Sequence, residues 1–170
     1  MDKNQHKKIN LNRSIVDISD IIKIEENSQC VDCYRTDIHY IDLNYAVFIC
    51  SNCAETHKLI FDSLLFNIVE VDENRKAKLT EKEIKLLKIG GNKNFRDLMS
   101  LYHCKEKRND IIDKYLNKAT IYYVKLISSK LNNYYLKEDK PSLNDGPKLV
   151  DKNMVEKEII ELYNYNKELI

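Results

Sequence analysis

Apolar residues follow two different spacings along this chain, and together they predict a mixed fold of strands and helices. The stretches 45–49 and 66–71 are rich in β-branched and aromatic residues and predict two core strands. Apolar residues at helical spacing predict a short amphipathic helix that runs from Ser14 toward Cys30, and a turn or two of helix over residues 54–61. We therefore expect a small sheet wrapped by helices.

The second half of the chain has the pattern of longer amphipathic helices. Residues 80–83, Thr-Glu-Lys-Glu, form a capping-box sequence that opens a helix, and the glycine pair at 90–91 is expected to end it. Asn92 is expected to cap the next helix, whose apolar stripe ends at Tyr102. A further apolar stripe predicts one long helix over residues 110–136.

Turn-forming residues between Pro141 and Pro147 predict a linker that precedes a C-terminal amphipathic helix. We expect this helix to pack back on the core; the alternatives are a helix that binds a partner and one that is swapped between copies. The predicted division is a flexible tail, a main domain, a linker and the C-terminal helix, at residues 1–13, 14–136, 137–148 and 149–170.

Four cysteines with the spacing C-x2-C-x16-C-x2-C predict a zinc site made by Cys30, Cys33, Cys50 and Cys53. Two residues between paired cysteines let a tight turn point both sulfurs at one ion, and the longer gap has room for a strand to return the second pair. Four thiolates complete the coordination of zinc, so one structural ion is expected and not a hydrolytic one. The alternative is four buried or disulfide-bonded cysteines. His57, close to the last ligand, is expected to pack or to form hydrogen bonds.

Composition narrows the possible classes of function. The 28 basic and 27 acidic side chains give a net charge of +1, which makes a nucleic-acid-binding zinc module the weakest reading, and no nucleic acid is expected as a partner. Neither a secretory signal nor an apolar membrane span is evident, so we expect a cytosolic protein in which thiols stay reduced. The fifth cysteine, Cys104, is expected to be a partly buried helix residue. No Gly-rich phosphate loop or catalytic triad indicates an independent enzyme.

The segment from Cys30 to His57 resembles the zinc-finger domain of Arf GTPase-activating proteins. That family has the same cysteine spacing, an Asn-Leu-Gly-Val-Phe segment between the pairs, and a His-Arg soon after them. The resemblance extends over residues 14–136 and implies an α+β fold with a small central sheet surrounded by helices and a helix-rich C-terminal half. The matching residues are Asn44, Val47, Phe48, Ala54, His57, Gly90, Gly91, Asn92, Phe95, Tyr115, Lys118 and Ala119.

This resemblance implies a regulator that accelerates GTP hydrolysis by a GTP-bound Arf-type small GTPase. It implies a role in vesicle trafficking, with coat or membrane-trafficking proteins as further partners. The expected location is cytoplasmic, at the periphery of Golgi or other trafficking membranes. The sequence departs from the family pattern in several places. Tyr40 replaces a tryptophan, Ala46 a glycine and Glu55 a small residue, and Lys58 stands at the arginine-finger position. The segment between His57 and Asp72 is also about one residue shorter than is usual in the family.

Lys58 is therefore the candidate catalytic residue. Lysine keeps the positive charge of arginine but lacks the planar fork that bridges two phosphate oxygens, so we expect a small part of the usual acceleration or none. The alternative is a non-catalytic module that binds a GTPase or coat partner. Arg35 and Arg75 are the nearby arginines that could substitute, and both are expected to be solvated surface residues.

Overall fold

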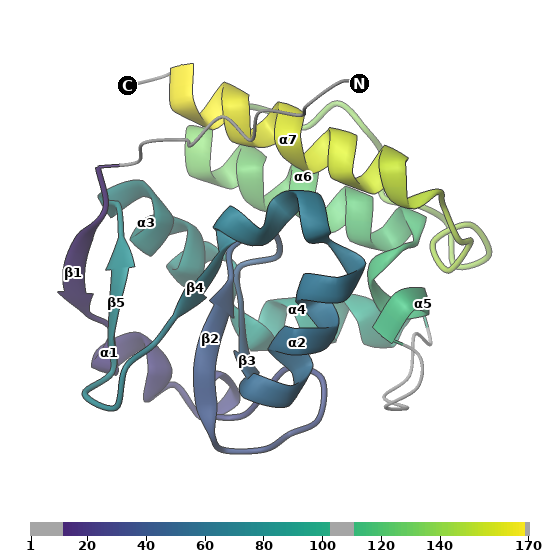
Figure 1. Ribbon diagram of the computed structural model, residues 1–170. Helices are drawn as coiled ribbons and strands as arrows, with labels where there is room; N and C mark the ends of the chain where they lie inside the picture. The colour runs from purple at the N-terminus through teal and green to yellow at the C-terminus, as the bar shows by residue number, and fades with distance from the viewer. Residues whose placement is uncertain (1–11, 103–110, 169–170) are drawn as a thin grey trace, which may run out of the picture.

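In the computed structural model of this chain, three antiparallel strands in the order β3-β2-β4 form the central sheet (Figure 1). The strands span Ile38–Asp42 (β2), Val47–Cys50 (β3) and Ile68–Glu70 (β4). The strands predicted at 45–49 and 66–71 are confirmed as β3 and β4, with later starts.

The structure describes residues 12–102 and 111–168, and only the backbone at residues 63, 66 and 162–168. Most of the predicted N-terminal tail lies outside the described residues. In the described part of the chain, no helix combines the length and the apolar character that crossing a membrane requires.

The middle strand, β2, is not evident from the sequence. His39 and Asp42 interrupt its apolar residues, so the segment lacks the composition typical of a core strand. In the structure Tyr40 pairs with Ile49 on one side and with Glu70 on the other. The extended conformation of β2 is therefore fixed by hydrogen bonding to a strand on each side and not by its local composition.

A second sheet consists of two antiparallel strands, Ser14–Asp17 (β1) and Lys76–Leu79 (β5). The prediction of a helix from Ser14 is wrong over these first residues, because their backbone pairs with β5 instead. Helical structure begins only at Ser19–Ile22 (α1) and continues as a short 3-10 turn at Glu25–Ser28 (η1). A distant strand thus overrides the local helical spacing of the isoleucines.

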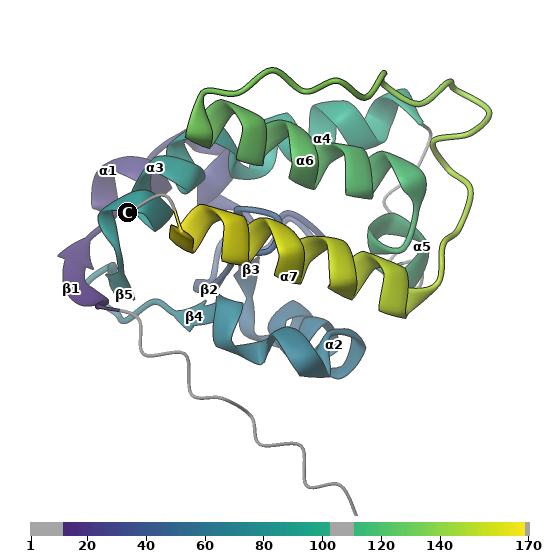
Figure 2. The same ribbon diagram turned by 90° about the horizontal axis from the view of Figure 1, so that it is seen from above.

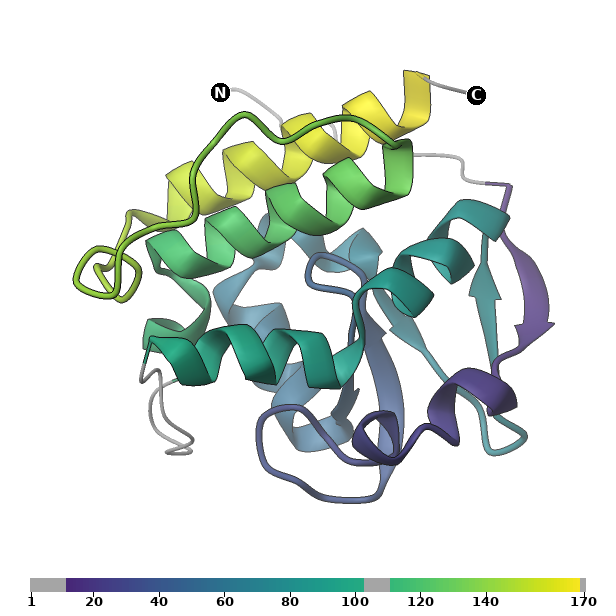
Figure 3. The same cartoon turned by 180° about the vertical axis from the view of Figure 1, so that it is seen from behind.

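The remaining helices surround the central sheet. The helix α6 contacts both α3 and α4, as the view from behind shows (Figure 3). The bounds are Ser51–Ile60 (α2), Asp62–Asn67 (η2), Glu81–Ile89 (α3), Gly91–Leu101 (α4), Ile111–Tyr115 (α5), Lys118–Asn132 (α6) and Lys152–Glu168 (α7).

The predicted capping box opens α3. The Thr80 hydroxyl accepts a hydrogen bond from the Glu83 backbone N–H at 3.1 Å, and the Glu83 carboxylate accepts one from the Thr80 N–H at 2.8 Å. The helix ends at the predicted glycine pair, where Gly91 has a φ of 81°. A Cβ on Gly90 would lie 2.6 Å from the Cβ of Ala46, so the close approach of these two segments requires glycine.

Asn92 does not cap α4 with its side chain, contrary to the prediction. Gly90 is the N-cap residue and no side-chain cap hydrogen bond is present there. The buried Asn92 side chain instead accepts a hydrogen bond from Phe48 N at 2.8 Å and donates one to Gln29 O at 2.7 Å. Asn92 therefore joins three segments that are far apart in the sequence.

The long helix predicted over 110–136 is wrong as a single element, because it divides into α5 and α6 around Asn117. The Asn117 side chain accepts from Thr120 N at 2.8 Å and caps α6. Backbone groups at the break pair with a distant segment, since Val150 N donates to Leu116 O. Such a break needs a partner for the freed backbone groups, and residues 148–150 supply it.

The C-terminal helix α7 packs back on the core, as expected, and lies beside α6 (Figures 1 and 2). Val155 and Ile159 on this helix are almost fully buried. The preceding turn-rich segment is also fixed in place, because the Gly146 carbonyl accepts a hydrogen bond from Ala119 N at 2.9 Å. The linker is thus part of the packed structure.

Candidate functional site

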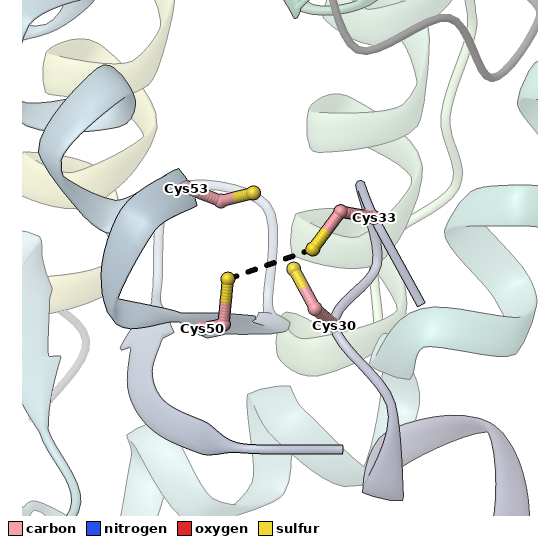
Figure 4. A group of neighbouring side chains, drawn as sticks. All are labelled: Cys30, Cys33, Cys50 and Cys53. Carbon is pink, nitrogen blue, oxygen red and sulfur yellow. Dashed lines mark hydrogen bonds between the residues drawn. The ribbon is translucent and has the colours of Figure 1, made fainter. Parts of the chain in front are cut away.

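The four predicted zinc ligands converge at one point (Figure 4). Cys30 and Cys33 come from the loop after η1, Cys50 ends β3, and Cys53 lies in the first turn of α2. The four Sγ atoms all lie within 4.8 Å of one another, and the Sγ atoms of Cys33 and Cys50 are 3.6 Å apart. A tetrahedral zinc with Zn–S bonds of ~2.3 Å has sulfur–sulfur edges of about 3.8 Å, so the cluster is a zinc-binding arrangement.

The backbone around the first cysteine pair holds its ligands in a tight turn. Cys30 N donates to Arg35 O at 2.7 Å, and Tyr34, with a φ of 62°, donates its N–H to Cys30 O at 3.0 Å. Val31 N donates to Phe48 O at 3.0 Å, which fastens this turn to β3 and so to the second pair. These backbone hydrogen bonds therefore hold the two cysteine pairs next to each other.

A shared proton shifts the pKa values of two thiols in the cluster in opposite directions. A hydrogen bond from Cys53 lowers the pKa of Cys30 to about 5, although burial of the thiol opposes this shift. The same shared proton raises the pKa of Cys53 far above its ordinary value. Binding of zinc by four thiolates releases that proton, so metal affinity is expected to rise with pH.

His57 lies fully buried between two carboxylates, and this arrangement confirms the expected packing or hydrogen-bonding role. Its Nδ1 donates to Asp42 Oδ2 at 2.7 Å, and its Nε2 donates to Asp32 Oδ2 at 2.9 Å. Burial alone would lower the pKa of His57, but the hydrogen bonds to Asp32 and Asp42 raise it to about 10. The ring is therefore an imidazolium at neutral pH.

Asp32, between the first two zinc ligands, is a centre of several charged contacts. Lys114 Nζ and the Tyr115 hydroxyl both donate to its Oδ1, at 2.9 and 2.8 Å. Burial alone would raise the pKa of the Asp32 carboxyl, but His57 and Lys114 hold it well below its ordinary value. Asp32 therefore joins the zinc turn to α2 and to α5.

A third cation, after His57 and Lys114, also lies against the zinc turn. Arg96, on α4, donates from Nη2 to Cys30 O at 2.6 Å, and its guanidinium carbon lies 4.2 Å from the centroid of the Tyr34 ring. Sequence reasoning missed Asp32, Asp42, Lys114 and Arg96. Of these four residues, only Asp32 could have been suspected from the sequence, because it lies between the first two cysteines. The other three lie on elements that folding brings close to the site.

Lys58 lies on α2 immediately after His57, and its side chain is one-third exposed. Its Nζ lies 2.8 Å from Glu55 Oε1 and 4.4 Å from the centroid of the Tyr40 ring on β2. The hydrogen bond to Glu55 raises the pKa of the Lys58 ammonium. Three positions that depart from the family pattern, 40, 55 and 58, thus meet in the folded protein.

The two alternative arginines lie on the surface. Arg35 is exposed in the turn of the first cysteine pair, and Arg75 is exposed in the turn between β4 and β5, where its φ is 58°. The Arg75 carbonyl accepts a hydrogen bond from Ile18 N at 3.0 Å. The predicted helix position of Cys104 lies outside the described residues.

Comparison with protein families gives a match that covers the whole cysteine cluster. The model of the ArfGap family, described as "Putative GTPase activating protein for Arf", matches residues 16–130. The matched segment runs from β1 into α6, includes Lys58, and leaves α7 outside. It accounts for more than half of the 170-residue chain. The cysteine geometry and this match agree, and the chain belongs to the ArfGap family of GTPase-activating proteins.

Proposed function

We propose that this protein binds a GTP-bound Arf-type small GTPase and weakly stimulates its GTP hydrolysis with Lys58. The observation that carries the proposal is the position of Lys58. Its ammonium lies at the surface of α2, one residue beyond His57, whose ring is clamped between Asp32 and Asp42. The cysteine cluster and the two hydrogen bonds of His57 fix the backbone of α2, while the Lys58 side chain remains accessible to a partner.

The chemistry assigned to Lys58 is electrostatic. As water attacks the γ-phosphoryl group, the bond to the GDP oxygen breaks and negative charge develops on the transferring and leaving oxygens. A cation inserted there stabilises that charge, and an arginine finger contributes ~10³–10⁵ in rate, or about 4–7 kcal/mol of barrier. An ammonium contacts one oxygen and is more strongly hydrated than a guanidinium, so we expect a stimulation of about 10- to 100-fold.

The zinc arrangement has a structural part in this proposal. Four thiolates leave no open coordination position, so the ion would fix the turn at Cys30 and the start of α2 without touching the nucleotide. The GTPase supplies the nucleotide and its magnesium. We place this activity in vesicle trafficking, in the cytoplasm or at the periphery of trafficking membranes, with coat proteins as further partners.

A second function is favoured by a specific observation at the same site. The Lys58 ammonium already has a carboxylate partner and an aromatic partner within the chain. A module that kept the fold and lost the chemistry would bind the GTPase or a coat protein without stimulating hydrolysis.

The test is single-turnover hydrolysis by an Arf-type GTPase loaded with GTP, together with a direct binding measurement. Wild type, Lys58→Ala and a control, Lys157→Ala on the exposed part of α7, are compared. Stimulation that Lys58→Ala abolishes and Lys157→Ala preserves supports the proposal. Binding with no stimulation by wild type selects the non-catalytic alternative. Absence of both binding and stimulation would overturn the assignment to an Arf-type partner.

A further inference from the structure

We propose that Glu55 and Tyr40 together form a holder for Lys58. In the free protein these two residues bind the Lys58 ammonium, and they must release it before the Lys58 side chain can reach a phosphate. Both are positioning residues that act through Lys58. This inference rests on the proposed function for its effect on catalysis, but the holder itself exists in the isolated protein and can be tested there.

The holder is built from two different elements. Glu55 lies one helical turn before Lys58 on α2, and its Oε1 accepts a hydrogen bond from Nζ at 2.8 Å. Tyr40 comes from β2 and places its ring 4.4 Å from Nζ, within the range of a cation–π contact. The ammonium is thus held between a helix and a strand, and its side chain lies along the protein surface.

Unequal exposure determines how the holder can open. The Glu55 side chain is 69% exposed and the Lys58 side chain 32%. Glu55 therefore keeps most of its contact with water, and opening requires Lys58 to leave the Tyr40 ring and turn outward. Such a movement needs only rotation of the Lys58 side chain, because Glu55 is exposed and Tyr40 is half-buried on β2.

Glu55 opposes the proposed chemistry in two ways. Its carboxylate accepts a hydrogen bond from the Lys58 ammonium and so competes with a phosphate oxygen for the same donor. Its negative charge also repels a phosphate that approaches Lys58. Exposed ion pairs and exposed cation–π contacts are each worth only about two- to five-fold in an equilibrium constant. The holder is therefore reversible, and it weakens stimulation without abolishing it.

An arginine at position 58 is also expected to be bound by Glu55 and Tyr40. A guanidinium pairs with a carboxylate through two parallel hydrogen bonds and stacks on an aromatic ring better than an ammonium does. Arginine introduced alone would therefore be held at least as strongly as Lys58. Removal of Glu55 together with this substitution would leave the arginine fork free for phosphate oxygens in a larger share of the molecules.

The first experiment uses the isolated protein and measures amine reactivity. Each lysine is labelled with a limiting amount of acetic anhydride, and the labelled sites are quantified by mass spectrometry. Glu55→Ala is expected to raise the labelling rate of Lys58 by about two- to five-fold, because the freed ammonium loses its raised pKa and its acceptor. Tyr40→Leu is expected to change the rate in the same direction.

A matched control on another helix accompanies these variants. Glu161→Ala removes an exposed partner of Lys157 on α7, where Nζ lies 3.8 Å from the carboxylate. This variant should leave the labelling of Lys58 unchanged. Equal labelling of Lys58 in wild type and Glu55→Ala would overturn the holder, whatever the GTPase assay shows.

The second experiment measures single-turnover GTP hydrolysis with the same Arf-type GTPase. Glu55→Ala/Lys58→Arg is expected to exceed Lys58→Arg by about two- to five-fold, the factor by which an exposed carboxylate holds the cation. Equal stimulation by Lys58→Arg and the double variant contradicts the holder. If Glu55→Ala frees Lys58 in the labelling assay but no variant stimulates hydrolysis, the holder stands and the proposed catalytic function fails.

Discussion

His57 Nε2 donates a hydrogen bond to Asp32 Oδ2 across 2.9 Å, and this bond ties α2 to the turn between the first two zinc ligands. Asp42, on β2, binds the other ring nitrogen at 2.7 Å. The buried ring therefore fixes the position of α2 against the metal cluster and the central sheet. Because Lys58 follows directly in the sequence, the same contacts fix where that side chain leaves the helix.

Replacement of His57 by leucine is expected to destabilise the fold strongly. The variant leaves Asp32 and Asp42 buried without the cation that both of them bind, and breaking a buried ion pair costs about 3–5 kcal/mol. Urea unfolding followed by circular dichroism measures this change. His39→Leu serves as the control, because the His39 side chain is exposed on β2, the strand that also carries Asp42. A His57→Leu protein as stable as the control would show that the two carboxylates find other partners.

The contribution of His57 to the free energy of unfolding is expected to fall as the pH rises above neutrality. The folded pKa of His57, about 10, lies above its ordinary value of 6.5, so the folded state holds this proton more tightly than the unfolded chain does. Its stabilising contribution is complete below pH 6.5 and is lost progressively as the pH rises through about 10. The difference in urea midpoint between wild type and His57→Gln should decrease from about pH 6.5 through 8 to 9.5, and a constant difference would argue against a buried imidazolium.

One zinc ion per chain is expected in the native protein, and its removal should unfold the N-terminal part of the fold. Zinc binding in small structural zinc modules contributes on the order of 10–16 kcal/mol of folding free energy. Native mass spectrometry measures the stoichiometry, and circular dichroism after chelation at about pH 5, where thiolates begin to protonate, measures the structural loss. Disulfides without metal in a reduced preparation would contradict the zinc assignment.

Two adjacent isoleucines on α7 provide a matched test of its packing. Ile159 is 4% exposed and Ile160 is 37% exposed. Truncation of Ile159 to alanine is expected to cost about 2–4 kcal/mol, because it removes buried apolar surface and leaves a cavity, while Ile160→Ala should cost less than about 1 kcal/mol. Equal effects in urea unfolding would mean that α7 does not stay docked in solution.

The features predicted most accurately from the sequence are those that depend on neighbouring residues. The spacing of four cysteines predicts a zinc site, and their sulfurs meet within 4.8 Å. The capping box at Thr80 and the glycine pair that ends α3 are likewise local, and the structure confirms both. In each case the chemistry lies within a few residues or in a spacing that one turn can close.

The errors arise where a distant segment supplies the deciding partner. Strand β1 forms because β5 offers its backbone groups, although the isoleucine spacing alone favours a helix. The break between α5 and α6 persists because residues 148–150 satisfy the backbone there. Asparagine is a residue type that often caps helices, but the Asn92 side chain forms hydrogen bonds with the backbone of Phe48 and Gln29 instead.

Residue types and their spacing are enough to predict the metal chemistry, the resemblance to a family and the candidate position of Lys58. The contacts of the Lys58 side chain, by contrast, arise only when the chain folds. Folding brings Glu55 and Tyr40 onto the Lys58 ammonium and places a charged His57 between two carboxylates. The physical reason is that a side chain's partners and pKa depend on burial and on charges that folding collects from separate elements.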